Sequence, residues 1–207
     1  MKRKFILKKR ANYTELKLQK YFFIFYKHSF ITSLCSNISK IMTKITLKGS
    51  PVNTVVELQK KGDKAKDFTL VKDDLSRVGL DDFQGSKLVL NIFPSLDTGT
   101  CAASVRYFNK AAADLENTQV LCISRDLPFA QARFCGAEGI ENVVTLSDYA
   151  TGEFGKNYGL EIADGPLAGL HSRVVIILDE DGTVLYIQQV PEIVDEPDYE
   201  DALKTLK

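Results

Sequence analysis

Continuous apolar runs mark the centre of the predicted fold. Residues 88–93 and 119–124 each have the length and the branched aliphatic content of a buried strand. After the first run, a segment spaces its apolar residues by three, four and three positions, at Val105, Phe108, Ala112 and Leu115. This spacing predicts an amphipathic helix whose first turn contains Cys101.

The second apolar run also leads into a helix. Residues 128–135 are predicted to be helical, because Pro128 suits a first helical turn and Gly136 follows the segment. Strand, helix, strand and helix in this order imply parallel pairing through right-handed crossovers. We expect a further strand over 143–146 and a short helix over 153–158.

Hairpins are predicted on both sides of this region. The alternating stretch 44–47 and the strand-like stretch 53–58 are separated by turn residues and predict an edge hairpin. Residues 173–179 and 183–190 flank Glu180-Asp181-Gly182, which is a strong hairpin signal.

The remaining segments complete the fold prediction. We expect a short strand over 68–71, a connector over 74–85, a glycine-rich loop over 162–170 and a closing helix over 198–206. A βαβα unit followed by an antiparallel hairpin and a final helix is the layout of an α/β, thioredoxin-like fold. Such a fold has a central mixed sheet flanked by helices. Here an N-terminal β-hairpin precedes it.

Charge divides the 207-residue chain into two parts. Residues 1–41 hold ten Lys or Arg residues and one Glu, whereas residues 42–207 hold 17 basic and 26 acidic residues. The first part is basic and aromatic, and its longest apolar run, 21–26, is far too short to span a bilayer. Lysines recur up to Lys27 and no clean cleavage pattern follows, which argues against a secretory signal.

Two interpretations of residues 1–41 stay open. The segment is either an organellar or other targeting peptide, or an upstream or disordered extension ahead of a true start at Met42. We favour the second and assign the single folded domain to residues 42–207. Nucleic-acid binding is disfavoured because this domain is acidic, and no membrane partner is expected.

Cys101 is the candidate nucleophile of the chain. The polar loop 94–101 follows an apolar strand and delivers this cysteine to the start of a helix. Unpaired backbone N–H groups and the positive end of the helix dipole favour the thiolate there. Without a secretory signal, we expect a reducing, cytoplasmic compartment and free thiols rather than a disulfide framework. Cys122 lies within an apolar strand and is predicted to be a buried residue without chemistry.

The spacing Pro94-x-x-x-Thr98-x-x-Cys101 resembles the signature of the peroxiredoxins. The resemblance covers the chain from about residue 43 to the C-terminus. Over this range the chain is similar in particular to the atypical two-cysteine branch of that family, the bacterial thiol peroxidases. The stretches that carry this resemblance are NIFPSLDTGTCAASVRYFN, LCISRDLPFAQARFCGAEG, IADGPLAGLHSRVVIILDEDG and EPDYEDAL.

The resemblance implies roles for five residues. Cys101 would be the peroxidatic cysteine, whose thiolate attacks a hydroperoxide and becomes a sulfenic acid, and Cys135 would resolve it as an intramolecular disulfide. Thr98 would donate a hydrogen bond to the thiolate or the peroxide. Arg173 would hold a fixed positive charge beside the sulfur. Pro94 would shape the loop and shield the sulfur.

The same resemblance implies an activity and partners. The expected enzyme is a thiol-dependent peroxidase for hydrogen peroxide and for alkyl or lipid hydroperoxides, active in antioxidant defence. Thioredoxin would be its reductant and a homodimer its working unit. This chemistry requires no metal and no organic cofactor. A redox sensor or binding protein that uses the same disulfide switch is the alternative from another class.

Three other interpretations compete at the level of single residues. Arg173 could be a surface salt-bridge partner, and His171 is expected to be a loop residue rather than a catalytic base. A zinc site made of Cys101, Cys122, Cys135 and His171 is disfavoured, because no close ligand pair such as CxxC anchors it.

Overall fold

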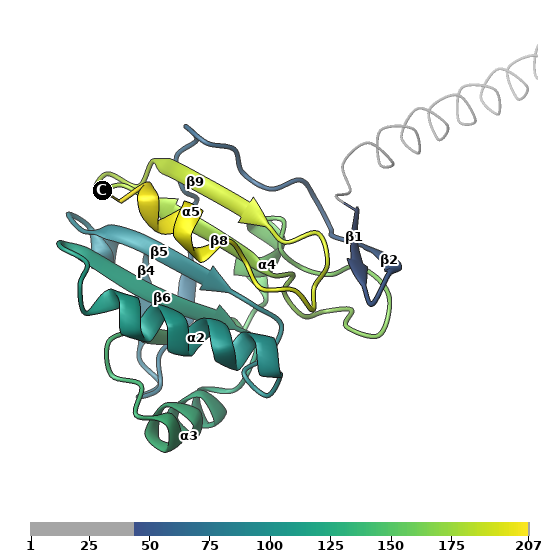
Figure 1. Ribbon diagram of the computed structural model, residues 1–207, viewed down its shortest axis with the longest axis horizontal. Helices are drawn as coiled ribbons and strands as arrows, with labels where there is room; N and C mark the ends of the chain where they lie inside the picture. Colours follow the sequence, from purple (N-terminus) through teal and green to yellow (C-terminus); the bar gives the residue numbers. More distant parts are fainter. Residues whose placement is uncertain (1–43, 207) are drawn as a thin grey trace, which may run out of the picture. The chain divides into compact units, whose positions relative to one another are not determined.

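The computed structural model describes residues 44–206. Within this range, seven strands form one mixed sheet in the order β4-β3-β7-β6-β5-β8-β9 (Figure 1). Their bounds are β3 (Thr69–Val71), β4 (Arg77–Gly79), β5 (Lys87–Ile92), β6 (Thr118–Ser124), β7 (Val144–Ser147), β8 (Val174–Leu178) and β9 (Val184–Gln189). The predicted domain boundary after residue 41, and the basic extension ahead of it, lie outside the described residues.

Strand direction in this sheet follows the sequence prediction. β5, β6 and β7 run parallel, whereas β8 is antiparallel to both β5 and β9. The crossovers that parallel pairing requires contain α2 (Gly99–Ala112) and α3 (Pro128–Glu138), and α4 (Glu153–Asn157) follows β7. The hairpin of β8 and β9 precedes the closing helix α5 (Tyr199–Lys204). The predicted mixed sheet with flanking helices is therefore confirmed.

Alternate residues of the central strands face opposite sides of the sheet, as the pleat requires. On one side, Leu90 and Leu121 belong to an apolar cluster with Phe154 of α4. On the other side, residues of β5, β6 and β8 form a second cluster with α2, α3 and α5, which includes Val89 and Val105. Among residues 44–206, no helix is long and apolar enough to cross a membrane.

The predicted N-terminal hairpin is present, but its second strand begins earlier than predicted. β1 (Lys44–Leu47) pairs with β2 (Ser50–Asn53), so most of the predicted strand 53–58 is wrong. Lys48 and Gly49 both have positive φ angles, 51° and 77°, which are the backbone conformation of a tight two-residue hairpin turn. This turn starts the second strand immediately after Gly49.

Two further element boundaries differ from the prediction. The connector 74–85 contains the short strand β4, which pairs with β3, and a 3-10 turn that buries Phe83. α3 continues through Gly136 to Glu138, because the residue that takes the left-handed C-cap conformation is Gly139, with φ 65°. A three-residue strand is too short for its alternation to be read from the sequence, and two nearby glycines made the helix end ambiguous.

Candidate active site

Cys101 lies in the first turn of α2, whose extended N-cap residue is Thr98. Its side chain is fully buried. The Thr98 hydroxyl does not cap the helix but lies 2.8 Å from Cys101 Sγ and 3.1 Å from the Ser95 carbonyl oxygen. A hydroxyl has one proton, so it can donate a full hydrogen bond to only one of these two acceptors, the sulfur or the carbonyl oxygen. With a thiolate at Cys101, the charged sulfur is the stronger acceptor.

Arg173 reaches the same sulfur from the neighbouring strand. β5 and β8 pair Ile92 with Val174, so the residue before β8 lies beside the loop that follows β5. Arg173 Nη2 is 3.5 Å from Cys101 Sγ, and the guanidinium also donates from Nε and Nη2 to the Ile193 carbonyl oxygen, at 3.1 and 3.0 Å. The backbone of the segment after β9 therefore aims the guanidinium at the thiol.

The charge of Arg173 is buried without an anionic partner. Only 2% of the residue is exposed, and no carboxylate forms an ion pair with it in the part of the chain that the structure describes. The interpretation of Arg173 as a surface salt-bridge residue is therefore wrong. The guanidinium therefore holds a positive charge beside the Cys101 sulfur.

Pro94 is buried in the loop between β5 and α2, and this loop is tied to the next crossover by Asp126. Ser95 Oγ donates to Asp126 Oδ1 at 2.7 Å, and the Leu96 backbone N–H donates to Oδ2 at 2.7 Å. Sequence reasoning missed Asp126. The available signal was its position two residues after the second parallel strand, at the end of the sheet that carries the cysteine loop.

The other two cysteines of the described range occupy different surroundings. Cys135 lies in the last turn of α3 and is half-buried, and it belongs to the same apolar cluster as Cys101. Burial raises the pKa of Cys135, and the Thr145 side chain partly opposes the shift. Cys122 is fully buried, which raises its pKa to about 12, and Asn91 Nδ2 lies 3.6 Å from its sulfur. All three thiols are free.

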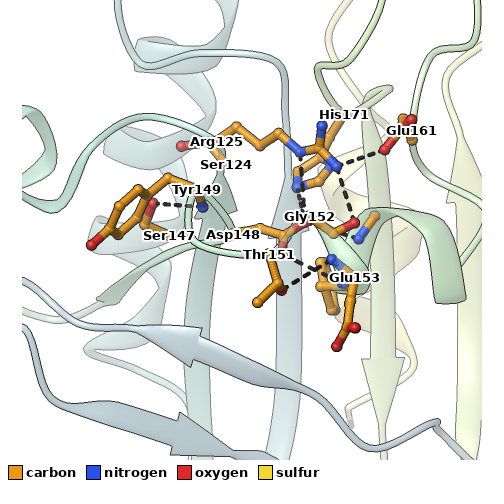
Figure 2. A network of polar contacts seen from close by, with 12 residues as sticks. Ser124, Arg125, Ser147, Asp148, Tyr149, Thr151, Gly152, Glu153, Glu161 and His171 are labelled. Atoms are coloured by element: carbon orange, nitrogen blue, oxygen red, sulfur yellow. Dashed lines mark hydrogen bonds and ion pairs between the residues drawn. The ribbon is translucent and has the colours of Figure 1, made fainter.

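A second cluster of charges, partly buried, surrounds Arg125, directly after β6 (Figure 2). Its guanidinium lies 2.6 Å from the Glu161 carboxylate and 3.7 Å from that of Asp148, and it donates to the carbonyl oxygens of Gly152 and Gly169. These partners belong to two connections, the one between β7 and α4 and the one between α4 and β8. Arg125 therefore holds the loop regions around α4 together.

His171 belongs to this cluster and not to the cysteine site. Its Nε2 lies 3.4 Å from an Asp148 carboxylate oxygen, and its ring packs edge-on against Phe154, a residue of the opposite face of the sheet. Burial, followed by the Arg125 charge, lowers the pKa of His171 to about 3, so the imidazole is neutral at pH 7. The four residues of the alternative zinc set are thus divided between the two faces.

The comparisons with known proteins agree with this geometry. Residues 60–203 match the family model described as Redoxin. A thiol peroxidase of Corynebacterium glutamicum is 54% identical over 165 residues, which cover 80% of this chain and 99% of that protein. The chain belongs to the thiol peroxidase family of redoxins. The family resemblance inferred from the sequence is confirmed.

Solved structures support the fold of this thiol peroxidase. The peroxiredoxin-like protein from Aquifex aeolicus is 38% identical with a TM-score of 0.75, covering 80% of this chain and 97% of that one. A thiol peroxidase from Chromobacterium violaceum has a TM-score of 0.71 at 23% identity, covering 79% and 94%. The second likeness concerns the fold alone. Within the thiol peroxidase, Thr98 and Arg173 contact the Cys101 sulfur, whereas Cys135 lies on a separate helix.

Proposed function

We propose that this enzyme reduces hydroperoxides through a Cys101 sulfenic acid and a Cys101–Cys135 intramolecular disulfide, which thioredoxin reduces. One observation carries the proposal. The Cys101 sulfur is fully buried and lies against a hydroxyl donor and a guanidinium whose charge has no carboxylate partner among residues 44–206. This environment suits a thiolate and the negative charge that leaves it during peroxide reduction.

In the first step, the Cys101 thiolate attacks the terminal oxygen of the hydroperoxide. A sulfur–oxygen bond forms, the oxygen–oxygen bond breaks, and the leaving alkoxide or hydroxide takes a proton to become alcohol or water. Arg173 Nη1 is buried and has no hydrogen-bond partner among the described residues, so it is an available donor for a peroxide oxygen. Together with the Thr98 hydroxyl, it would stabilise the charge on the leaving oxygen.

In the second step, the Cys135 sulfur attacks the sulfenic sulfur of Cys101, a disulfide forms and water leaves. A disulfide requires Cα atoms about 4.4–6.8 Å apart and converging Cβ vectors. In the reduced protein each thiol has other neighbours, Thr98 and Arg173 for Cys101 and Thr145 for Cys135. Local opening of one or both helix ends would let the two sulfurs meet. A thioredoxin dithiol then supplies the two electrons that restore both thiols.

The substrates, assembly and location belong to the same proposal. Hydrogen peroxide and alkyl or lipid hydroperoxides are the proposed substrates, and the apolar cluster around Cys101, which includes Phe93 and Leu96, is compatible with an organic group. A homodimer is supported by the exposed apolar side chains of Leu127, Phe129 and Tyr149, which follow the adjacent strands β6 and β7. Free thiols suit the reducing cytoplasm.

A coupled assay with thioredoxin, thioredoxin reductase and NADPH tests the catalytic cycle. We expect sustained NADPH oxidation with hydrogen peroxide or an alkyl hydroperoxide. Cys101→Ser should abolish it, and Cys135→Ser should allow one oxidation without forming the intramolecular disulfide. Cys122→Ser is the matched control and should retain turnover. A single stoichiometric oxidation without turnover in the wild-type protein would favour the redox sensor instead.

A further inference from the structure

A continuous chain of hydrogen bonds joins the loop before Cys101 to the helix that carries Cys135. At one end, the Thr98 backbone N–H donates to the Ser95 carbonyl oxygen at 3.2 Å, and Ser95 Oγ donates to Asp126. At the other end, Gln131 of α3 donates from Nε2 to Ser124 Oγ at 3.1 Å, and Ser124 Oγ donates to Asp126 Oδ2 at 2.8 Å. The Asp126 carboxylate is the centre of this chain.

The bonds to Asp126 have the features of a strong and directional contact. Three donors reach the carboxylate at 2.7–2.8 Å, two from the cysteine loop and one from the end of β6. Ser124 and Gln131 are fully buried. Hydrogen bonds to an ionised acceptor are stronger than neutral ones, and partial exclusion of water strengthens them further.

The other polar ties between α3 and the cysteine loop or α2 are exposed. Arg133 and Asp97 are 3.4 Å apart, with side chains 67% and 71% exposed. Arg106 and Glu138 form a two-point contact at 2.8 and 2.9 Å, but both side chains remain accessible. Exposed ion pairs contribute little to stability. The hydrogen bonds of Asp126 are therefore the main polar connection between the cysteine loop and α3.

We propose that Asp126 is a positioning residue that holds the cysteine loop in its peroxide-reactive form and must release that loop before the disulfide closes. The inference rests on the proposed Cys101–Cys135 cycle. Through Ser95, the carboxylate fixes the turn that presents the Thr98 hydroxyl to the sulfur. Opening that moves Ser95 and Leu96 in the loop before α2, or that moves the segment leading into α3, breaks hydrogen bonds to Asp126.

This role gives two opposite kinetic effects. Weakening the contacts of Asp126 disorders Thr98 and slows the first oxidation, while it eases the opening that resolution needs. Resolution competes with a second oxidation, in which another hydroperoxide converts the Cys101 sulfenic acid into sulfinic acid and is itself reduced to an alcohol or water. Faster resolution therefore leaves less sulfinic acid.

The test compares wild type with Asp126→Asn, with Glu138→Gln as matched control, because it also neutralises a carboxylate that ties α3 to α2. Rapid quenching and mass spectrometry measure three quantities: the rate of loss of the Cys101 thiol, the rate of disulfide formation from the sulfenic acid, and the sulfinic fraction at excess peroxide. Asp126→Asn should slow the first rate by about tenfold. It should also raise the second rate and lower the sulfinic fraction.

Glu138→Gln should leave all three quantities within about twofold of wild type. The inference is overturned if Asp126→Asn slows both steps or changes neither, because a purely structural defect gives no opposite effects.

A second variant serves if Asp126→Asn fails to fold by circular dichroism. Ser95→Ala removes one of the three hydrogen bonds to Asp126 and must give the same opposite effects on the two steps, each of them smaller. If the wild-type protein forms no Cys101–Cys135 disulfide, the proposed function itself has failed. If it forms one and the variants show no split, only the role of Asp126 is refuted.

Discussion

Two arginines lie at the same end of the central strands, Arg173 buried and Arg125 with 19% of its side chain exposed, and their partners differ. Arg125 follows β6 and lies against the carboxylates of Glu161 and Asp148 (Figure 2). Arg173 precedes β8 and lies against backbone carbonyl oxygen and the sulfur of Cys101, with no carboxylate partner among residues 44–206. The Arg125 guanidinium is neutralised by carboxylates, whereas the charge of the Arg173 guanidinium has no carboxylate partner among these residues.

This difference distinguishes Arg125, which stabilises the structure, from Arg173, for which we propose a role in the reaction. A buried cation is costly unless an anion compensates it. Around Arg125 the compensating groups are the carboxylates of Glu161 and Asp148, so the group holds loops together. Around Arg173 the side chain that the guanidinium contacts is the Cys101 thiol. The same residue type therefore stabilises loops in one place and, as we propose, stabilises negative charge at the Cys101 sulfur in the other.

Removing the guanidinium at Arg173 should have the largest effect. Arg173→Met deletes both the charge and the hydrogen-bond donors at the sulfur, and the second-order rate of Cys101 oxidation should fall by about 10³-fold, or about 4 kcal/mol in the barrier. Rapid-quench kinetics with hydrogen peroxide measure this rate. Arg173→Lys, which keeps the charge, should lose less. If Arg173→Met oxidises Cys101 at a rate near that of wild type, Arg173 has no role in the reaction.

Removing the guanidinium at Arg125 should act on stability. Arg125→Met leaves the Asp148 and Glu161 carboxylates unpaired, and the free energy of unfolding should fall by about 3 kcal/mol. Urea denaturation measures the loss. The oxidation rate of Cys101 in the folded fraction should stay close to that of wild type. A large loss of rate without a loss of stability would reverse the comparison between the two arginines.

The hydroxyl of Thr98 should have a smaller effect than Arg173. Thr98→Val keeps the shape of the side chain but deletes the donor 2.8 Å from the sulfur. A lost hydrogen bond to a charged acceptor predicts a rate about 10- to 30-fold lower. Thr98→Ser is the control and should retain most of the rate, since it keeps the hydroxyl. Equal rates for the Val and Ser variants would show that the hydroxyl is dispensable.

His171 adds a pH dependence to the Arg125 cluster. Its native pKa of about 3 lies below the ordinary value of 6.5, so between these values the unfolded chain binds a proton that the native protein does not. Stability should therefore fall as pH drops through this window, by up to about 1.4 kcal/mol per pH unit. Burial raises the pKa of the neighbouring Asp148, which acts in the opposite direction.

Urea denaturation at pH 7, 6, 5 and 4 tests the His171 contribution against a variant that cannot titrate. His171→Asn should be less stable at pH 7, because it loses buried packing, but should lose less stability on acidification. Parallel pH profiles for the two proteins would mean that His171 does not carry this dependence.

Local sequence signals predicted the main elements and the centre of the site. The apolar run 88–93, the loop after it and the helix periodicity placed Cys101 in a first helical turn, because all of these signals lie within about 30 residues. The family resemblance added Thr98 and Arg173, and both contact the sulfur. The assignments of their roles, and that of Cys135, remain predictions.

Contacts between distant loops were not predictable. Arg125 and Asp126 are adjacent charged residues after a strand, which is typical of a solvated turn. The partners of Arg125 lie 23 and 36 positions away, at Asp148 and Glu161, and those of Asp126 lie about 30 positions away in the cysteine loop. Only the parallel register of β5, β6 and β7 brings these loops to one edge. The hairpin error has another origin, since Lys48 in a positive-φ turn is a rare use of lysine.

The site of the first oxidation tests the central claim most directly. Cys135→Ser blocks resolution, so the sulfenic acid formed with one equivalent of hydroperoxide can be trapped by dimedone and located by peptide mass spectrometry. The account predicts the label on Cys101, with Cys122 unlabelled because its buried thiol has a pKa of about 12. Label on Cys122, or peroxide consumption with no label on Cys101, would contradict it.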